Sequence, residues 1–263
     1  MSAAFTGDPL DLFRSLYCLT LAVILLGRLR ADSAFMRLQP EMRPLPRLLG
    51  RWALPRLAAG PWLASVLMLV ALLVAVGLGL PSAVALVAAS ALSLLHFAQL
   101  AGAPTVHRKA NTIPVLLALF AASMVPGTAD PATVSSAVRT TAKLLIAQIY
   151  FSAGLCKLRA SGWRWADGVS LQRWLAYYHL RDGSALTLKL AASRGLCRLA
   201  AGLALGFELT FWLVIPFPVL EWVYLPAALC FHVATAWLLR INYWIYLGPA
   251  YLVFAAEAIA AAH

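Results

Sequence analysis

The sequence predicts an all-α, polytopic membrane protein. Of its 263 residues, 62% are hydrophobic and only 12% are charged, whereas soluble domains contain about 45–50% apolar and about 25% charged residues. A core formed in water cannot use so much apolar surface, but a membrane span needs about 20 consecutive apolar residues. We therefore predict one transmembrane helix bundle over residues 1–263.

Apolar runs of near-spanning length divide this bundle into about eight helices. They are predicted over residues 10–27, 62–80, 82–101, 112–126, 138–156, 199–217, 219–239 and 241–261. The fourth run is short, so it is expected to be tilted or partly re-entrant. The junctions Leu80-Pro81 and Phe217-Pro218 leave almost no loop, and each is expected to join a tight antiparallel hairpin.

The N-terminal stretch MSAAFTGDPLD carries two acids and no base, which is the reverse of a signal peptide. The first apolar run is therefore expected to remain as a span. The cysteines form neither a C-x-x-C motif nor a metal-ligand spacing, so we interpret them as small hydrophobic residues and predict no metal site. They are Cys18, Cys156, Cys197 and Cys230.

Basic residues gather in alternate connections, after the first, third, fifth and seventh predicted helices, which together hold 18 of the 21. By the positive-inside rule these connections face the cytoplasm, and both termini lie outside a multi-pass cell membrane. The net charge of +11 is thus explained by topology and anionic headgroups, and nucleic-acid binding is not predicted.

Two basic connections, residues 28–60 and 157–198, mix arginines with large apolar side chains. Within the second, residues 169–180 place Leu171, Trp174 and Tyr178 at helical spacing. Such elements lie in the headgroup plane of a membrane. The alternative is that they simply cap the bundle, and the residues alone do not separate the two.

Ionisable and amide side chains inside apolar runs are candidate functional residues, because an ionisable group costs roughly 2.5–3.5 kcal/mol at the centre of a span. They are Arg14, His96, Gln99, Gln148, Lys157, Glu208 and His232. Each also has a structural interpretation. Arg14 would reach the interface or hold a helix end, and Gln148 would form an interhelical hydrogen bond.

Glu208 and His232 lie at comparable depths in consecutive predicted helices. A carboxylate in the membrane must be paired, be protonated or face water. A Glu208–His232 pair or a Glu208–Arg14 pair would satisfy this requirement, in either a functional or a purely structural role.

Lys157 ends the fifth apolar run and is followed by Trp163 and Trp165. A lysine that flanks a span is usually an interfacial anchor. However, an amine held under aromatic rings at low dielectric loses stabilisation of its charged form and can act as a base near neutral pH. Both interpretations stay open from these residues alone.

The stretch YFSAGLCKLRASGWRWADGVSL, residues 150–171, resembles a signature of the vitamin K-dependent γ-carboxylase family, whose bacterial relatives are the horizontally transferred transmembrane (HTTM) proteins. Three other stretches resemble the family in the same order, so that the likeness extends from Leu10 to about Leu252. They are DPLDLFRSLYCLTL with Arg14, HRKANTIPVLLAL with Asn111, and CFHVATAWLLRINYWIYLGPAYL with His232.

This resemblance implies that Lys157 is the base that deprotonates a quinol, with Trp163, Trp165 and Gly168 shaping the loop over it. It also implies an isoprenoid quinone or quinol as cofactor, in a bacterial inner membrane. Thr112 occupies the position where the carboxylases have a histidine, so carboxylation of peptide glutamates is not expected.

Two functions from different classes follow. The first is a membrane-embedded enzyme, quinol-linked or carboxylase-like, in which Lys157, Glu208 and His232 are catalytic. Its substrate would be bound by the residues Arg14, Asn111, Gln148, Trp163, Trp165 and Gly168. The second is a non-catalytic accessory subunit whose basic loops bind a partner protein or anionic lipid. A transporter is disfavoured, because the sequence shows no inverted repeat.

Overall fold

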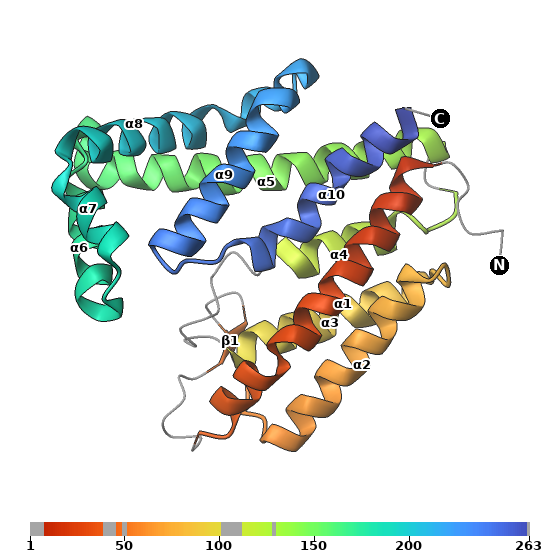
Figure 1. The fold of residues 1–263 in the computed structure, drawn as a ribbon. Helices are drawn as coiled ribbons and strands as arrows, with labels where there is room; N and C mark the ends of the chain where they lie inside the picture. Colours follow the sequence, from red (N-terminus) through yellow and green to blue (C-terminus); the bar gives the residue numbers. More distant parts are fainter. Residues whose placement is uncertain (1–7, 39–45, 49–51, 101–111, 128–129, 262–263) are drawn as a thin grey trace. The chain divides into compact units, whose positions relative to one another are not determined.

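The computed structural model describes residues 8–38, 46–48, 52–100, 112–127 and 130–261. The described residues are mainly helical, with one short antiparallel pair of strands in which Arg47 lies opposite Ala53 and Leu48 opposite Trp52. The helices divide into two compact units, residues 1–142 with 245–263 and residues 143–244 (Figure 1).

Unit 1 is a bundle in which α1 packs on α2, α2 on α3 and α3 on α4. Its elements are α1 (Pro9–Met36), β1 (Arg47–Leu48), β2 (Trp52–Ala53), α2 (Ala59–Gly77), α3 (Ala83–Gln99), α4 (Thr112–Ala122), the first part of α5 (Pro131–Ser161) and most of α10 (Trp244–Ala261). Phe13 and Tyr17 of α1 and Phe120 of α4 form an edge-to-face aromatic cluster with ring centroids 5.2–6.0 Å apart. Such rings supply much of a core's apolar area.

Unit 2 contains the second part of α5 and the shorter helices that follow it. These are η3 (Gly162–Asp167), α6 (Val169–Asp182), α7 (Ala185–Ala192), α8 (Arg194–Thr210), η4 (Phe211–Val214), η5 (Pro218–Leu220) and α9 (Glu221–Leu238). α6 packs against α7 and α8, η3 packs against α8, and α8 packs against α9.

Helices occur at all eight predicted positions, but they do not all have the character of spans. Four segments are long and apolar enough to cross a membrane by length and composition: Pro9–Met36, Ala59–Gly77, Arg194–Val214 and Pro218–Leu238. Ala83–Gln99, Thr112–Ala122 and Tyr246–Ile259 are shorter apolar helices. Over the described residues the structure thus confirms the all-α fold class, with helices long and apolar enough to cross a membrane, but not the count of eight spans.

Two helices extend beyond the apolar runs that predicted them. α1 continues from residue 27 to Met36, because Arg28 and Asp32 form an i,i+4 ion pair of 3.0 Å and Asp32 is buried. α5 begins at Pro131, where Asp130 accepts a hydrogen bond from the Thr133 N–H at 3.1 Å. Hydropathy does not detect polar helical turns of this kind.

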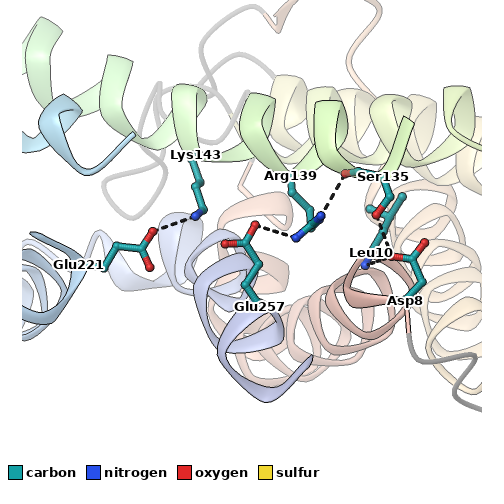
Figure 2. A network of polar contacts seen from close by, with 7 residues as sticks. All are labelled: Asp8, Leu10, Ser135, Arg139, Lys143, Glu221 and Glu257. Atoms are coloured by element: carbon teal, nitrogen blue, oxygen red, sulfur yellow. Dashed lines mark hydrogen bonds and ion pairs between the residues drawn. The ribbon is translucent and has the colours of Figure 1, made fainter. Parts of the chain in front are cut away.

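The first half of α5 carries polar side chains at a spacing of four residues (Figure 2). In unit 1, Ser135 donates to Asp8 at 2.7 Å and Arg139 binds Glu257 at 3.0 Å. In unit 2, Lys143 binds Glu221 at 2.8 Å. Arg139 and Lys143, the bases predicted outside the arginine-rich side, are therefore both ion-paired.

Gly77 is expected to be required for the packing of α1 against α2. A Cβ atom there would lie 2.5 Å from Cγ of Leu19 and 3.3 Å from the Ser15 carbonyl oxygen. Gly77→Ala should therefore lower the free energy of unfolding by about 1–3 kcal/mol, the usual cost of overpacking. Gly60→Ala on the same helix is the control, because a Cβ there meets nothing within 4 Å. Unfolding in a detergent titration measures both, and equal stability of the two variants would contradict this packing.

Candidate functional site

The candidate site lies in unit 2, along one face of α5. Tyr150, Gly154 and Lys157 are spaced by four and three residues, which brings them onto one side of a helix. Tyr150 and Gly154 are buried, and Lys157 is half-buried two turns after Tyr150. The face changes from aromatic to basic within two turns.

Lys157 is paired with Glu208 of α8. Its ammonium donates to both carboxylate oxygens of Glu208, and its side chain is 24% exposed against 4% for that of Glu208. The pair is thus dry on the carboxylate side and partly open on the amine side. A buried carboxylate requires such a partner, because removing an unpaired charge from water costs several kcal/mol.

Trp165 lies over the amine. The Lys157 Nζ atom is 4.5 Å from the centroid of its ring, which is a cation–π contact. Trp165 belongs to η3, the short helix that directly follows α5. The ammonium is therefore held between a carboxylate and an indole.

Gly168, at the end of η3, allows the backbone there to lie close to the first turns of α8. Its φ is +83°, a conformation that glycine adopts at little cost. A Cβ atom there would lie 2.4 Å from the Arg198 backbone nitrogen and 2.6 Å from the Cys197 carbonyl carbon. Only glycine permits this approach, which brings Trp165 to Lys157.

Gly154 allows α5 and α8 to approach each other beside the ion pair. A Cβ atom there would lie 3.0 Å from Leu209 Cδ2 and 3.2 Å from Glu208 Cβ. The small residue one turn before Lys157 therefore lets the Glu208 backbone come close enough for its short side chain to reach the amine.

Two turns before Lys157 on α5, Tyr150 forms a hydrogen bond with His232 of α9. The Tyr150 hydroxyl and His232 Nε2 are 2.5 Å apart, and both side chains are buried. Phe207 and Phe211 pack on the Tyr150 ring with centroids 4.9 and 4.7 Å away. The His232 ring itself lies among Phe231 and Trp244, with centroids 5.5 and 5.8 Å away.

Tyr243, in the segment between α9 and α10, adds a second phenol to this region. Its ring centroid is 6.2 Å from that of His232. Burial raises the pKa of the Tyr243 hydroxyl, and the neighbouring Glu208 and Tyr178 raise it further. Tyr243 therefore remains a neutral phenol in this region.

The other residues predicted for the site have different surroundings. Arg14 is buried and pairs with Asp11 on its own helix. Gln148 is exposed on α5, and Trp163 is 74% exposed, so it does not cover Lys157 as Trp165 does. Asn111 lies outside the described residues.

The partners of the buried acids therefore differ from those expected from positions along the predicted helices. Arg14 was considered as a partner of Glu208, but its carboxylate is Asp11. Glu208 is bound by Lys157, and His232 by Tyr150. Tyr150 and Tyr243 were not identified as candidates, although Tyr150 lies about two turns before Lys157 in residues 150–171.

A second buried polar cluster, in unit 1, includes an acid that the sequence did not single out. Asp32 lies 3.9 Å from His96 Nε2, and both side chains are 1% exposed. The His96 ring is stacked on Trp62 with centroids 5.7 Å apart. Near it, Gln99 accepts from the Leu57 N–H and donates to the Pro55 carbonyl.

The described part of the chain contains no group of three or more His, Cys, Asp or Glu residues able to hold a metal ion. A surface hollow lies over Thr133, Ser136 and Thr140 in the first turns of α5. Those residues precede Lys157 by more than a dozen positions, so the hollow is not beside the ion pair. Comparisons with protein-family models, with curated proteins and with solved structures give no match to this chain.

Proposed function

We propose that the protein is a polytopic membrane enzyme of the HTTM type, with about eight spans and its arginine-rich loops in the cytoplasm. Lys157 acts in it as a base on a quinol or another lipid-soluble hydroxyl compound. The observation that carries this proposal is the Lys157–Glu208 pair beneath Trp165. The likeness of residues 150–171 to the carboxylase signature points to the same lysine.

The pair can work as one proton-sharing unit. Transfer of the Lys157 proton to Glu208 leaves a neutral amine beside a carboxylic acid, so no net charge is created in a dry site. The amine then takes the proton of a substrate hydroxyl, and the new ammonium stabilises the oxyanion. The cation–π contact with Trp165 favours that ammonium.

We propose that the hydrogen bond between His232 and Tyr150 helps to hold the helices that carry the ion pair. This hydrogen bond links α5 to α9, and Phe207 and Phe211 pack on the Tyr150 ring. We assign His232 a positioning role, because the atoms that face the amine come from Glu208 and Trp165.

A reduced quinol with one isoprenoid unit tests the proposal, added without oxygen to the protein in nanodiscs. Ultraviolet difference spectra should show the red-shifted quinolate band in the wild-type protein, and Lys157→Met should lose most of it. Lys143→Met is the matched control, because Lys143 lies on α5 as Lys157 does and also forms an ion pair, with Glu221 of α9. It should keep the band.

One observation favours a second candidate function, that of a non-catalytic accessory subunit. The Lys157 ammonium is already neutralised by Glu208, as in a purely structural ion pair. Absence of quinol binding by calorimetry, or an unchanged spectrum in Lys157→Met, would overturn the enzymatic proposal in favour of this one.

A further inference from the structure

The α6–α7 pair forms a small helical layer with one buried side. The buried side chains are Leu175 and Tyr178 of α6 and Thr187 of α7. The two helices are tied together by a hydrogen bond from the Gln172 amide to the Ala191 carbonyl, at 2.8 Å. Gly183, with a φ of +70°, makes the turn between them.

The outer side of this layer is apolar and aromatic. Trp174 is 55% exposed, Tyr177 51% and Leu180 84%. Exposed rings at helical spacing have little reason to face water, whereas Trp and Tyr are enriched where a membrane meets water. We call these three residues, with Arg173, Arg181 and Lys189, the α6–α7 platform.

The charge of the platform is strongly positive. Residues 157–198 contain eight Lys and Arg against two Asp, and Arg173, Arg181 and Lys189 are exposed. The Arg181 guanidinium lies 4.7 Å from the Tyr178 ring centroid, so its stem follows the aromatic surface. An amphipathic helix that combines bases with Trp and Leu binds anionic membrane surfaces.

The platform also lies in the chain where a membrane surface is expected. It joins the end of α5 to Arg194, where a segment able to span a membrane begins. A connection at the end of a span lies at the level of the lipid headgroups.

We propose that the α6–α7 platform is a docking surface for anionic phospholipids, which it gathers around unit 2 in preference to zwitterionic ones. Trp174, Tyr177 and Leu180 enter the interface, and Arg173, Arg181 and Lys189 contact the phosphates. This proposal does not depend on the chemistry of Lys157.

A fluorophore attached to the Leu180→Cys variant tests it, in the full chain with Cys156→Ser and Cys230→Ser at the two exposed cysteines. The protein is placed in vesicles of 70% phosphatidylcholine and 30% phosphatidylglycerol. Two samples are compared, in which a small fraction of either the phosphatidylglycerol or the phosphatidylcholine carries a nitroxide quencher. Quenching by the phosphatidylglycerol label should exceed that by the phosphatidylcholine label about twofold or more.

Arg173→Gln with Lys189→Gln should bring the ratio of the two quenching values close to one. Arg30→Gln with Arg37→Gln removes the same charge from exposed positions in and directly after the last turns of α1 and should leave the ratio high. The proposal is overturned if the wild-type ratio is one or if both double variants lower it equally. It is also overturned if neither label quenches, as expected for a platform covered by protein.

Discussion

Glu208→Ala is expected to lower the free energy of unfolding by about 3 kcal/mol. The substitution leaves the Lys157 ammonium, which is only 24% exposed, without the carboxylate that neutralises it. Removing one partner of a buried ion pair costs about 3–5 kcal/mol, and the partial exposure of Lys157 places the value at the low end. Unfolding by detergent titration in mixed micelles measures the change.

A double-mutant cycle separates the pair from the burial of its members. Replacing both residues by apolar ones, as in Lys157→Met with Glu208→Leu, should recover most of the loss, because no charge is then stranded. Glu221→Ala, on α9, removes the acid of the Lys143 pair and leaves an ammonium whose side chain is 12% exposed. It should therefore cost a similar amount. A cost for Glu208→Ala of about 1 kcal/mol or less, the usual value for exposed pairs, would show that the pair is solvated.

Gly168→Ala should be the most damaging glycine substitution near the site, at about 2–4 kcal/mol. A positive φ costs a non-glycine residue about 1–3 kcal/mol. The new Cβ would also meet the backbone of Cys197 and Arg198, which cannot move as a side chain can. The variant should therefore displace η3 and withdraw Trp165 from Lys157, which the fluorescence of a probe attached near Trp165 can report.

Gly162→Ala is the matched control for that substitution. Gly162 starts the same short helix with a φ of +58°, but a Cβ atom there meets nothing within 4 Å. It should show only the conformational cost, about 1 kcal/mol. If both variants lose the same stability, the close approach of η3 to α8 is wrong.

Hydropathy predicted the helices well and their ends poorly. Each apolar run became a helix, because apolar runs without internal glycine or proline clusters have few alternatives in this chain. The extension of α1 past Arg28 depended on the buried Asp32, whose burial is a tertiary property. Likewise, the polar first turns of α5 are stabilised by contacts with residues far away in the sequence, such as Asp8 and Glu257.

The sequence proposed Lys157, Glu208 and His232 as candidates, and the structure pairs Lys157 with Glu208 and His232 with Tyr150. Lys157, Glu208 and His232 were identified because ionisable residues in apolar runs need partners. Depth along a helix does not give its rotation, so Glu208 was assigned to His232 or Arg14 and not to Lys157. The sequence signal that could have found the pair is Gly154, a small residue one turn before Lys157 that lets α8 approach.

The two tryptophans illustrate the same limit. Trp163 and Trp165 are two residues apart and were both expected over the amine. In the tight helix η3, successive side chains point in different directions. Trp165 therefore faces Lys157, while Trp163 is exposed. Exposure of this kind is expected of a tryptophan that anchors a helix at the membrane surface.

The most direct test of the Lys157–Glu208 pair is a solid-state NMR measurement on protein in nanodiscs, labelled with 15N at lysine Nζ and 13C at glutamate Cδ. A short-range Nζ–Cδ contact that disappears in Glu208→Gln is expected. The Lys143–Glu221 contact, assigned by its loss in Glu221→Gln, provides the internal reference. If Glu208→Gln removes no contact while Glu221→Gln does, the amine of Lys157 does not meet the carboxylate, and the proposed proton-sharing unit does not exist.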